Sequence, residues 1–325
     1  MVDVSIIIVN YRTPELIVEC LKTVQQFTRQ VSYEVIVVDN QSKGDDEGYV
    51  KEHFPHINWI PMGYNAGFGR ANNLGMKHAA GRYFLLLNSD TKLFEGVIDK
   101  CVANLDYRAD VIAGGAYQVY PNLSPRAFYH TFTFRRDFWI TPPPLRKYLD
   151  MLIPYTKYDD PEQVDYIAAA FLMVRREGFE KTGGFDEEFF LYGEDTEWGN
   201  RLGKIGKQLV FKNCRIIHEE WGSKPERYED AQNFTYFNRF DEQIQLSNLV
   251  WIRKQYGAFH YFMLMLHYWL WVPVFFLMKI AANALKLKNP FGELYNQKRF
   301  ARTIGLFSGF FWRILLKRPT FYKIK

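Results

Sequence analysis

Residues 4–9 read Val-Ser-Ile-Ile-Ile-Val, residues 34–38 read Glu-Val-Ile-Val-Val, and residues 83–87 read Tyr-Phe-Leu-Leu-Leu. Each run is short and almost wholly apolar, and helical or turn-forming stretches separate the runs. Continuous apolar strands that alternate with helices are typical of a mostly parallel sheet that is covered on both faces. The sequence therefore predicts an α/β fold with a mostly parallel central sheet and helices on both faces.

Polar residues follow each of these three strands. Asn10 follows the first strand, Asp39 follows the second, and Asn88-Ser89-Asp90 follows the third. In open α/β sheets, ligands bind beyond the carboxyl ends of the strands. Asp and Asn are also common turn formers, but three such positions at one edge favour a ligand site. We expect these side chains to converge there.

The periodicity of the rest of the chain predicts further elements. These are a helix over 14–27, a short strand near 58–61, a helix over 72–80, a strand over 165–174, a helix from 194 to about 203, and a last strand over 208–217. Residues 121–164 lack a clear period and contain three consecutive prolines, which predicts a long loop or lid.

A few titratable residues are candidates for chemistry. Asp90 follows an apolar strand, where one carboxylate suits a hard divalent cation that also binds substrate phosphates. His218 ends the last predicted strand and either completes such a site or is an ordinary surface or core histidine. Glu194 and Asp195 stand at a helix start, where the helix dipole favours acids in any case. A general base is the functional interpretation of this pair, and spacing alone leaves both open.

Composition and missing motifs exclude several classes. The 325 residues are 48% hydrophobic and 24% charged, which is ordinary for a globular protein and excludes collagen-like and disordered chains. The three cysteines form no CxxC pair, which argues against a disulfide framework or a cysteine zinc site. No P-loop and no GxSxG motif occurs, and Gly67-Phe68-Gly69 lacks the third glycine of a dinucleotide-binding loop.

Five motifs occur in order along the first two thirds of the chain. They are Ser5-Ile-Ile-Ile-Val-Asn-Tyr, Val37-Val-Asp-Asn-Gln-Ser, Asn65-Ala-Gly-Phe-Gly-Arg-Ala-Asn-Asn, Leu86-Leu-Asn-Ser-Asp, and Gly183-Gly-Phe-Asp-Glu-Glu-Phe-Phe-Leu-Tyr-Gly-Glu-Asp-Thr-Glu-Trp. Together they resemble family 2 glycosyltransferases, most closely the bacterial rhamnosyltransferase-type enzymes of surface-polysaccharide assembly. The resemblance covers about residues 3–222. It implies a GT-A fold, a nucleotide-diphosphate sugar donor such as dTDP-rhamnose, a divalent metal (Mn2+ or Mg2+), and inversion at the anomeric carbon.

The resemblance also implies roles for individual residues. Asp195 matches the catalytic base, with Glu194 beside it. The donor-binding positions are Asn10, Tyr11, Asp39, Asn40, Asn65, Gly67, Asn72, Asn73 and Ser89. Asp90 and His218 match metal-binding positions, and Asn88 is a further candidate. Because Asn88 is an amide where the family has the first acid of its DXD motif, Asp90 would carry most of the metal ligation.

The C-terminal part of the chain is basic and rich in aromatic residues. Residues 243–325 contain thirteen Lys and Arg but one acid, Glu293. Residues 261–278 are nearly all apolar and reach the threshold length for a membrane span. Basic residues flank this segment on both sides, so a simple span would place one basic cluster on the wrong side. The sequence favours a segment that lies in the interface, or that dips in and returns at Pro273, over a span or a buried core helix. Residues 303–316 fit a second interfacial helix.

These observations predict a GT-A domain over 1–225 and a C-terminal helical, membrane-associating region over 226–325. The expected function is metal-dependent, inverting sugar transfer to a lipid-linked glycan acceptor. Because no secretory signal is evident and the basic tail suits an anionic membrane surface, we expect a peripheral or monotopic protein on the cytoplasmic face of a bacterial inner membrane. We expect no nucleic-acid partner. The alternatives are another nucleotide-diphosphate enzyme, such as a nucleotidyltransferase, and a non-catalytic protein that binds membranes or nucleic acid.

Overall fold

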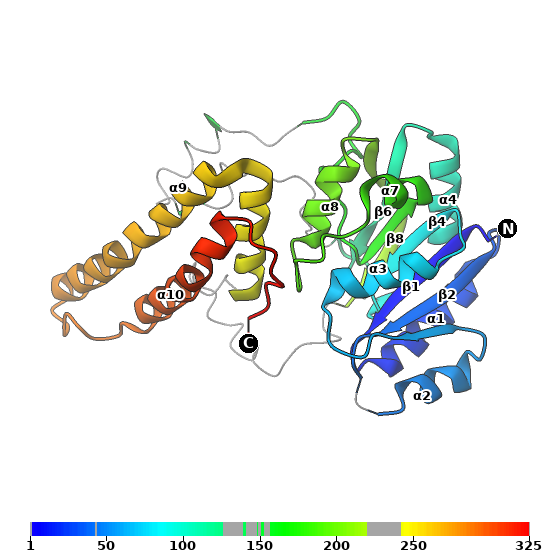
Figure 1. Cartoon of the computed structure of the whole chain (residues 1–325), viewed down its shortest axis with the longest axis horizontal. Helices are drawn as coiled ribbons and strands as arrows, with labels where there is room; N and C mark the ends of the chain where they lie inside the picture. Colours follow the sequence, from blue (N-terminus) through cyan, green and yellow to red (C-terminus); the bar gives the residue numbers. More distant parts are fainter. Residues whose placement is uncertain are drawn as a thin grey trace. The chain divides into compact units, whose positions relative to one another are not determined.

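The computed structural model describes residues 2–42, 44–125, 139–140, 148, 151–152, 157–219 and 242–324. The chain forms two compact units: unit 1 holds residues 1–132 and 156–228, and unit 2 holds residues 133–155 and 229–325. Figure 1 labels the helices and strands of both units. The loop expected over 121–164 lies largely outside the described residues, and so does the expected boundary at residue 225.

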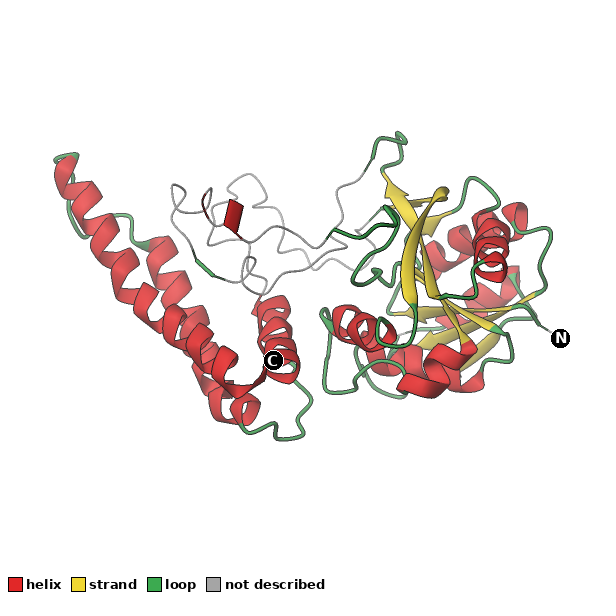
Figure 2. Cartoon of the chain, turned by 90° about the horizontal axis from the view of Figure 1, so that it is seen from above, coloured by secondary structure: helices red, strands yellow, loops and turns green. Residues whose placement is uncertain are grey.

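Unit 1 is built on one eight-stranded sheet, drawn in yellow in Figure 2. Its strands are β1 (Val4–Asn10), β2 (Tyr33–Asp39), β3 (Asn58–Pro61), β4 (Tyr83–Leu87), β5 (Thr91–Lys92), β6 (Val111–Val119), β7 (Phe171–Arg175) and β8 (Lys207–His218). The strand order is β3-β2-β1-β4-β7-β6-β8-β5. The first four strands in this order are parallel, whereas β7 runs antiparallel between β4 and β6. The α/β class is confirmed, and the sheet is mixed rather than mostly parallel throughout.

One strand is shorter than the sequence predicts. The apolar stretch expected as a strand over 165–174 forms β7 only from Phe171. The small residues before it make a turn, in which the Phe171 N–H donates to the Ala168 carbonyl at 3.4 Å. Small apolar residues fit such a turn as well as a crowded strand, so the apolar pattern of residues 165–174 did not show where the strand begins.

Helices cover both faces of the sheet (Figure 2). They are α1 (Pro14–Phe27), α2 (Asp46–His53), α3 (Phe68–His78), α4 (Val97–Tyr107), α7 (Arg176–Thr182) and α8 (Glu194–Leu202). Side chains of β1 alternate between the faces, as a strand requires. Ile6 and Ile8 join a core with α1 and α4, whereas Ile7 joins a second core with α3 and α8. Burial on both faces explains why the strands read as unbroken apolar runs.

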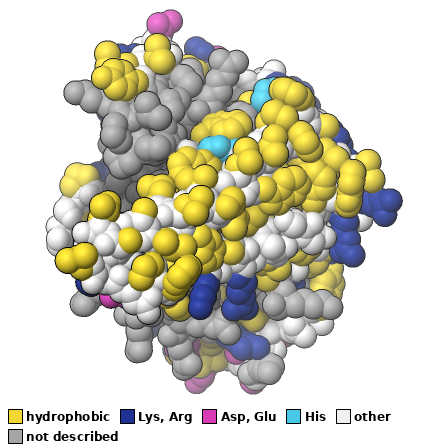
Figure 3. Space-filling model, turned by 90° about the vertical axis from the view of Figure 1, so that its left-hand side faces the viewer, with side chains coloured by type: hydrophobic (Ala, Val, Ile, Leu, Met, Phe, Trp, Pro, Cys, Tyr) yellow, Lys and Arg dark blue, Asp and Glu magenta, His cyan; other side chains and the backbone are white. Residues whose placement is uncertain are grey.

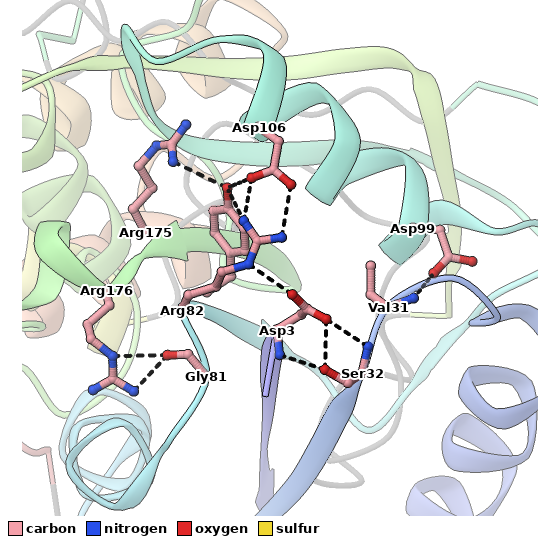
Figure 4. Close-up of polar contacts among 10 residues, drawn as sticks. Asp3, Val31, Ser32, Gly81, Arg82, Asp99, Asp106, Arg175 and Arg176 are labelled. Atoms are coloured by element: carbon pink, nitrogen blue, oxygen red, sulfur yellow. Dashed lines mark hydrogen bonds and ion pairs between the residues drawn. The ribbon is translucent and has the colours of Figure 1, made fainter. Parts of the chain in front are cut away.

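A network of charged residues closes the edge of the sheet where β1 and β4 begin (Figure 4). The Arg82 guanidinium donates to Asp3 Oδ1 at 2.9 Å and forms a two-pronged contact with Asp106. The Tyr83 hydroxyl donates to Asp106 Oδ1 at 2.6 Å and accepts from Arg175 at 3.2 Å. These groups satisfy one another, so their contacts stabilise this edge of the sheet.

Unit 2 contains two long helices, α9 (Glu242–Leu285) and α10 (Tyr295–Leu315). Gly257 has φ 91° and ψ 178°, so α9 consists of two helices that meet at this glycine. The second helix continues through Pro273, which corrects the expectation that the chain could return at this proline. A proline inside a helix removes one backbone hydrogen bond and bends the helix, and here it does not end it. Of the described helices, α9 alone is long and apolar enough to cross a membrane, by length and composition.

Candidate active site

Asn10 ties together the ends of β1 and β2, which are parallel neighbours. Its fully buried side chain places the two N–H groups of Nδ2 within hydrogen-bond distance of three oxygens: Asp39 Oδ1 (3.1 Å), Ser42 Oγ (2.7 Å) and Asp46 Oδ2 (2.9 Å). Its Oδ1 accepts the N–H of Thr13 at 3.1 Å, just before α1 begins. A buried amide that is satisfied in this way is rigid. Asn10 therefore orients Asp39 at the carboxyl end of the sheet.

Asn40 holds the turn over residues 65–67 against the end of β2. It is 5% exposed, its Oδ1 accepts the Ala66 N–H at 2.7 Å, and its Nδ2 donates to Asn65 Oδ1 at 3.2 Å and to the Gly67 carbonyl at 3.4 Å. The next residue, Phe68, opens α3 and donates its N–H to the Phe190 carbonyl at 3.0 Å. The turn thus connects the β2 end to the segment that leads into α8.

Replacing Gly67 with alanine should destabilise unit 1 more than the same change at Gly63. Both glycines have positive φ, 79° and 78° respectively. An added Cβ at Gly63 meets nothing within 4 Å, whereas at Gly67 it would lie 2.1 Å from the Phe190 carbonyl oxygen. We expect Gly63→Ala to cost about 1 kcal/mol and Gly67→Ala to cost roughly 2 kcal/mol more. Urea unfolding measures both, and equal midpoints would contradict the close approach of residues 67 and 190.

Asp90 and His218 are brought together by pairing of the main chain. β5 lies antiparallel to β8 so that Thr91 faces His218, and the Glu219 N–H donates to the Asp90 carbonyl at 3.1 Å. His218 Nε2 lies 3.3 Å from Asp90 Oδ1, and both side chains are mostly buried. His218 Nδ1 donates to Gln118 Oε1 at 2.9 Å, a contact that favours the tautomer with the proton on Nδ1. In this tautomer the lone pair of Nε2 faces Asp90.

This pair fits a divalent cation that is also bound by substrate. Two ligands at right angles on a Mg2+ or Mn2+ ion lie about 3 Å apart, close to the Nε2–Oδ1 separation of 3.3 Å. Within the part of the chain that the structure describes, no three His, Cys, Asp or Glu side chains cluster as a metal site. Two protein ligands suit a cation that keeps waters and binds phosphates. The Asn88 atom near His218 Nε2, at 3.4 Å, is its amide nitrogen rather than its oxygen.

Asp195 is connected to this group through residues 169 and 170, which directly precede β7. Tyr192 (φ 64°) and Gly193 (φ 80°) are both left-handed, and this turn leads directly into the first residues of α8. The Asp195 carboxylate accepts the Thr196 N–H at 2.8 Å, and the nearby backbone N–H of Ala169 also favours its charged form. The neighbouring Ala170 carbonyl accepts the Asn88 N–H at 3.1 Å. Burial raises the pKa of Asp195, and these N–H groups oppose that rise.

Glu194 is 4% exposed and carries a buried oxygen, Oε2, that has no hydrogen-bond partner within the described part of the chain. Its Cγ lies against Gly69 in the first turn of α3. Burial, and then the charge of Asp195, raise the pKa of Glu194 well above the usual range. Two adjacent buried carboxylates disfavour double ionisation. More N–H groups favour the charged form of Asp195 than that of Glu194, so we expect Asp195 to keep the charge and Glu194 to stay protonated.

Buried contacts fix the position of α8. Trp198 Nε1 donates to Thr182 Oγ1 at 2.7 Å, and its ring meets Phe185 edge-on at 4.7 Å. The Asn73 side chain on α3 binds the backbone of Phe185 through both amide atoms. Nδ2 donates to the Phe185 carbonyl at 2.8 Å, and Oδ1 accepts the Phe185 N–H at 2.9 Å. These contacts lock α3 and α8 together.

The structure brings most of the proposed site residues to one edge of the sheet. One network of contacts joins Asn10, Asp39, Asn40, Asn65 and Gly67. A second joins Asn88, Asp90 and His218. Ser89 Oγ lies 3.1 Å from Thr13 Oγ1 and so connects the two networks. The amide of Asn72 donates within α3 to Phe68, and the Asn73 amide holds Phe185. Tyr11 lies under the Arg12 guanidinium at 5.1 Å.

Three side chains at this edge were missed by reasoning from the sequence. Gln118 lies near the end of β6 and fixes the His218 ring. The rule that found Asn10 and Asp39, a polar residue at the end of an apolar strand, would also have found Gln118. Ser42 and Asp46 hold Asn10, but they lie in an ordinary polar loop and gave no such signal.

Comparison with known proteins assigns a family to this arrangement. The family model described as Glycosyl transferase family 2 matches residues 5–183, more than half of the chain. The chain belongs to glycosyl transferase family 2. This confirms the resemblance that the five sequence motifs carry.

Two bacterial relatives of this family 2 chain are each 28% identical to it. The O-antigen biosynthesis protein RfbC of Myxococcus xanthus aligns over 233 residues, which is 68% of this chain and 18% of that protein. The N-acetylglucosaminyl-diphospho-decaprenol L-rhamnosyltransferase of Mycobacterium tuberculosis aligns over 212 residues, 57% of this chain and 66% of that protein. The chain thus spans less than two thirds of either relative.

Solved structures confirm the GT-A fold of this family 2 chain. S. aureus TarS in complex with UDP-GlcNAc has a TM-score of 0.52 and 16% identity, covering 77% of this chain and 66% of TarS. GalNAc-T7 with UDP, GalNAc and Mn2+ has a TM-score of 0.54 and 14% identity, covering 94% of this chain and 55% of GalNAc-T7.

Proposed function

We propose that this family 2 protein is an inverting, divalent-metal-dependent glycosyltransferase that moves a sugar from a nucleotide-diphosphate donor to a lipid-linked glycan acceptor. One observation carries the proposal. The candidate base and the candidate metal-binding segment approach adjacent residues at the carboxyl edge of the sheet: the Ala169 N–H lowers the pKa of Asp195, and the backbone N–H of Asn88 donates to the Ala170 carbonyl at 3.1 Å. This is the edge at which open α/β sheets bind ligands.

Asp195 acts as the general base of a single displacement. The acceptor hydroxyl oxygen bonds to the anomeric carbon while its proton moves to the Asp195 carboxylate. The bond between that carbon and the diphosphate oxygen breaks on the opposite face, and the electron pair leaves with the diphosphate. One displacement inverts the carbon. The Thr196 N–H holds the carboxylate, and such a positioned base accelerates proton transfer by about 10²–10⁴-fold.

Asp90 and His218 would hold the divalent cation, which, when bound, supplies charge neutralisation for the departing diphosphate. Gln118 keeps the His218 proton on Nδ1, so that Nε2 is available as a ligand. At the other side of the edge, Asp39 and the turn over 65–67 would bind the nucleoside. Asn10 and Asn40 serve as positioning residues for these groups.

The names of the relatives support a choice of substrates. One is an L-rhamnosyltransferase that acts on a diphospho-decaprenol, and another belongs to O-antigen biosynthesis. We therefore propose dTDP-rhamnose as the donor and a polyprenol-linked glycan as the acceptor. We place the protein on the cytoplasmic face of the membrane, with residues 1–225 catalytic and residues 226–325 membrane-associating.

A screen of nucleotide sugars tests this function directly. The purified full chain should release free nucleoside diphosphate from one donor, faster when the acceptor lipid is added. Release of pyrophosphate would instead indicate a nucleotidyltransferase. Turnover of no donor in the presence of polyprenol-linked acceptors and Mn2+ would contradict the proposal.

Glu194→Ala should lower kcat/KM for the donor by at least roughly tenfold, whereas Glu194→Gln should stay within about threefold of wild type. The reason is the unused O–H group on Oε2, which we assign to a hydroxyl of the transferred sugar; a glutamine amide also donates a hydrogen bond and an alanine does not. Kinetics of the two variants measure this. Equal losses would contradict the role of a neutral donor, because they would show that the charge matters.

A further inference from the structure

The second helix of α9, residues 258–285, exposes an apolar stripe. Residues 258–278 contain no Asp, Glu, Lys or Arg. Exposed apolar side chains recur along it at helical spacing: Phe259, Phe262, Leu270, Val274, Leu277 and Met278, which we call the α9 stripe. Four of the six are more than half exposed, at 69%, 60%, 65% and 58% for Phe259, Leu270, Leu277 and Met278. A contiguous apolar surface of this length marks an interaction site.

Another face of the same helix packs on α10. Three contacts fix the pairing along its length: Tyr261 with Phe311 (5.6 Å between ring centroids), Trp269 Nε1 with Ser308 Oγ (2.9 Å), and Phe275 with Phe300 (5.0 Å). The reversed order of the partners shows that the helices are antiparallel. Because α10 already occupies this face, the α9 stripe is the surface left for a partner outside unit 2.

The charge around the stripe selects an anionic lipid surface as that partner. Thirteen basic residues and one acid follow residue 242, and that acid, Glu293, pairs with Lys279 at 3.1 Å and with Lys288 at 3.6 Å. Figure 3 shows the apolar side chains gathered on one face with Lys and Arg along its border. A second copy of the chain would bring the same positive charge and be repelled. Each basic residue near an anionic membrane strengthens binding about fivefold.

The position of Arg302 indicates that the helix pair does not cross the bilayer. On α10, Arg302 is exposed and lies between Phe300, which faces Phe275, and Ser308, which faces Trp269. It is therefore level with about residue 273, roughly 8 Å along the axis from the middle of the apolar segment. In a crossing orientation this arginine would sit inside a hydrocarbon core whose half-thickness is about 15 Å.

We infer that the α9–α10 pair is an interfacial membrane anchor. It lies in the plane of one leaflet, with the α9 stripe in the hydrocarbon and the basic side chains at the anionic headgroups. In this orientation the basic residues at both ends of the apolar segment stay on the same side of the membrane. The inference rests on the proposed membrane association of residues 226–325 and is tested by lipid binding alone. A failure of lipid binding would leave the proposed sugar transfer unaffected, and a failure of sugar transfer would leave the lipid binding unaffected.

Vesicle binding tests which surface makes the contact. The purified full chain should float with phosphatidylcholine vesicles more strongly when they contain phosphatidylglycerol, and high salt should weaken this binding. Leu270→Asp combined with Leu277→Asp should weaken it by at least roughly tenfold. A matched control, Tyr107→Asp with Ile205→Asp, changes two exposed apolar residues of unit 1 and should bind like wild type. Unchanged vesicle binding by the stripe variant would overturn the inference. The inference would also be overturned if the two substitutions dissociated an oligomer of the chain and left vesicle binding unchanged.

Labelling from one side of the membrane tests the in-plane orientation. Leu287 lies between the two helices and is 95% exposed, so Leu287→Cys marks the tip of the pair. The native cysteines Cys20, Cys101 and Cys214 are buried, and the wild type gives the baseline. When the variant is added to preformed vesicles, a membrane-impermeant maleimide should label residue 287 fully. If residue 287 is protected from the maleimide until detergent is added, the tip lies inside the vesicle, and this result would contradict the in-plane orientation.

Discussion

Asp195→Asn should lower kcat by at least about 10³-fold, while the Kd for the nucleoside diphosphate stays within about threefold of wild type. An asparagine keeps the size and the acceptor oxygen for the Thr196 N–H, but its amide cannot take the proton of the acceptor hydroxyl. Single-turnover transfer measures the chemical step, and calorimetry measures donor binding. Asp159→Asn, an exposed carboxylate of unit 1, is the control and should retain wild-type rates.

Near-normal turnover by Asp195→Asn would contradict the assignment of the base. Glu194 would then be the next candidate, and Glu194→Gln would show the large loss instead. The pH profile gives an independent check. A base must be ionised to act, and burial raises the pKa of Asp195. The rate of the wild type should therefore fall as the pH drops through a value above the usual range of an aspartate.

The second large effect is expected at the candidate metal ligands. In wild type, Mn2+ should tighten nucleoside diphosphate binding by roughly tenfold or more, and EDTA should abolish transfer. Asp90→Ala should remove most of this tightening and leave binding without metal unchanged, because only the metal-linked part of the affinity depends on this carboxylate. Titrations with and without Mn2+, with Asp159→Asn as control, measure the difference. A variant that still responds fully to Mn2+ would show that the cation is held elsewhere.

The parallel half of the sheet could be predicted from the sequence because its strands are buried on both faces. The run over 34–38 lies within β2, and the short strand near 58–61 is β3 with the same bounds. The placement of β7 between β4 and β6 could not be predicted. An apolar run looks the same whether its neighbours are parallel or antiparallel, and the order of strands is set by contacts between distant segments.

The start of α3 shows how tertiary contacts override local propensity. The sequence predicted a helix from residue 72, since Gly67-Phe68-Gly69 contains two glycines, which disfavour helix. The helix begins at Phe68 instead. The Phe68 N–H is satisfied by the Phe190 carbonyl, 122 residues away in the chain, and Gly67 allows the two backbones to approach. No local pattern contains this information.

Parts of the candidate site that consist of polar side chains could be predicted from the sequence, whereas parts that consist of backbone groups could not. Polar residues at strand ends predicted the positions of Asn10, Asp39, Asp90 and His218, which the structure places along one edge. Asp195 approaches this edge at residues 169 and 170, where the Ala169 N–H lowers its pKa and the Ala170 carbonyl accepts the Asn88 N–H. Alanine has no polar side chain to signal such a role, so only the fold reveals it.

A crystal structure of the full chain with the nucleoside diphosphate product and Mn2+ tests the central claim most directly. The account predicts the nucleoside against Asp39, the cation between the diphosphate and Asp90 with His218, and the Asp195 carboxylate facing the vacated sugar position. A diphosphate bound away from Asp90, or a nucleoside bound at another edge of the sheet, would contradict it.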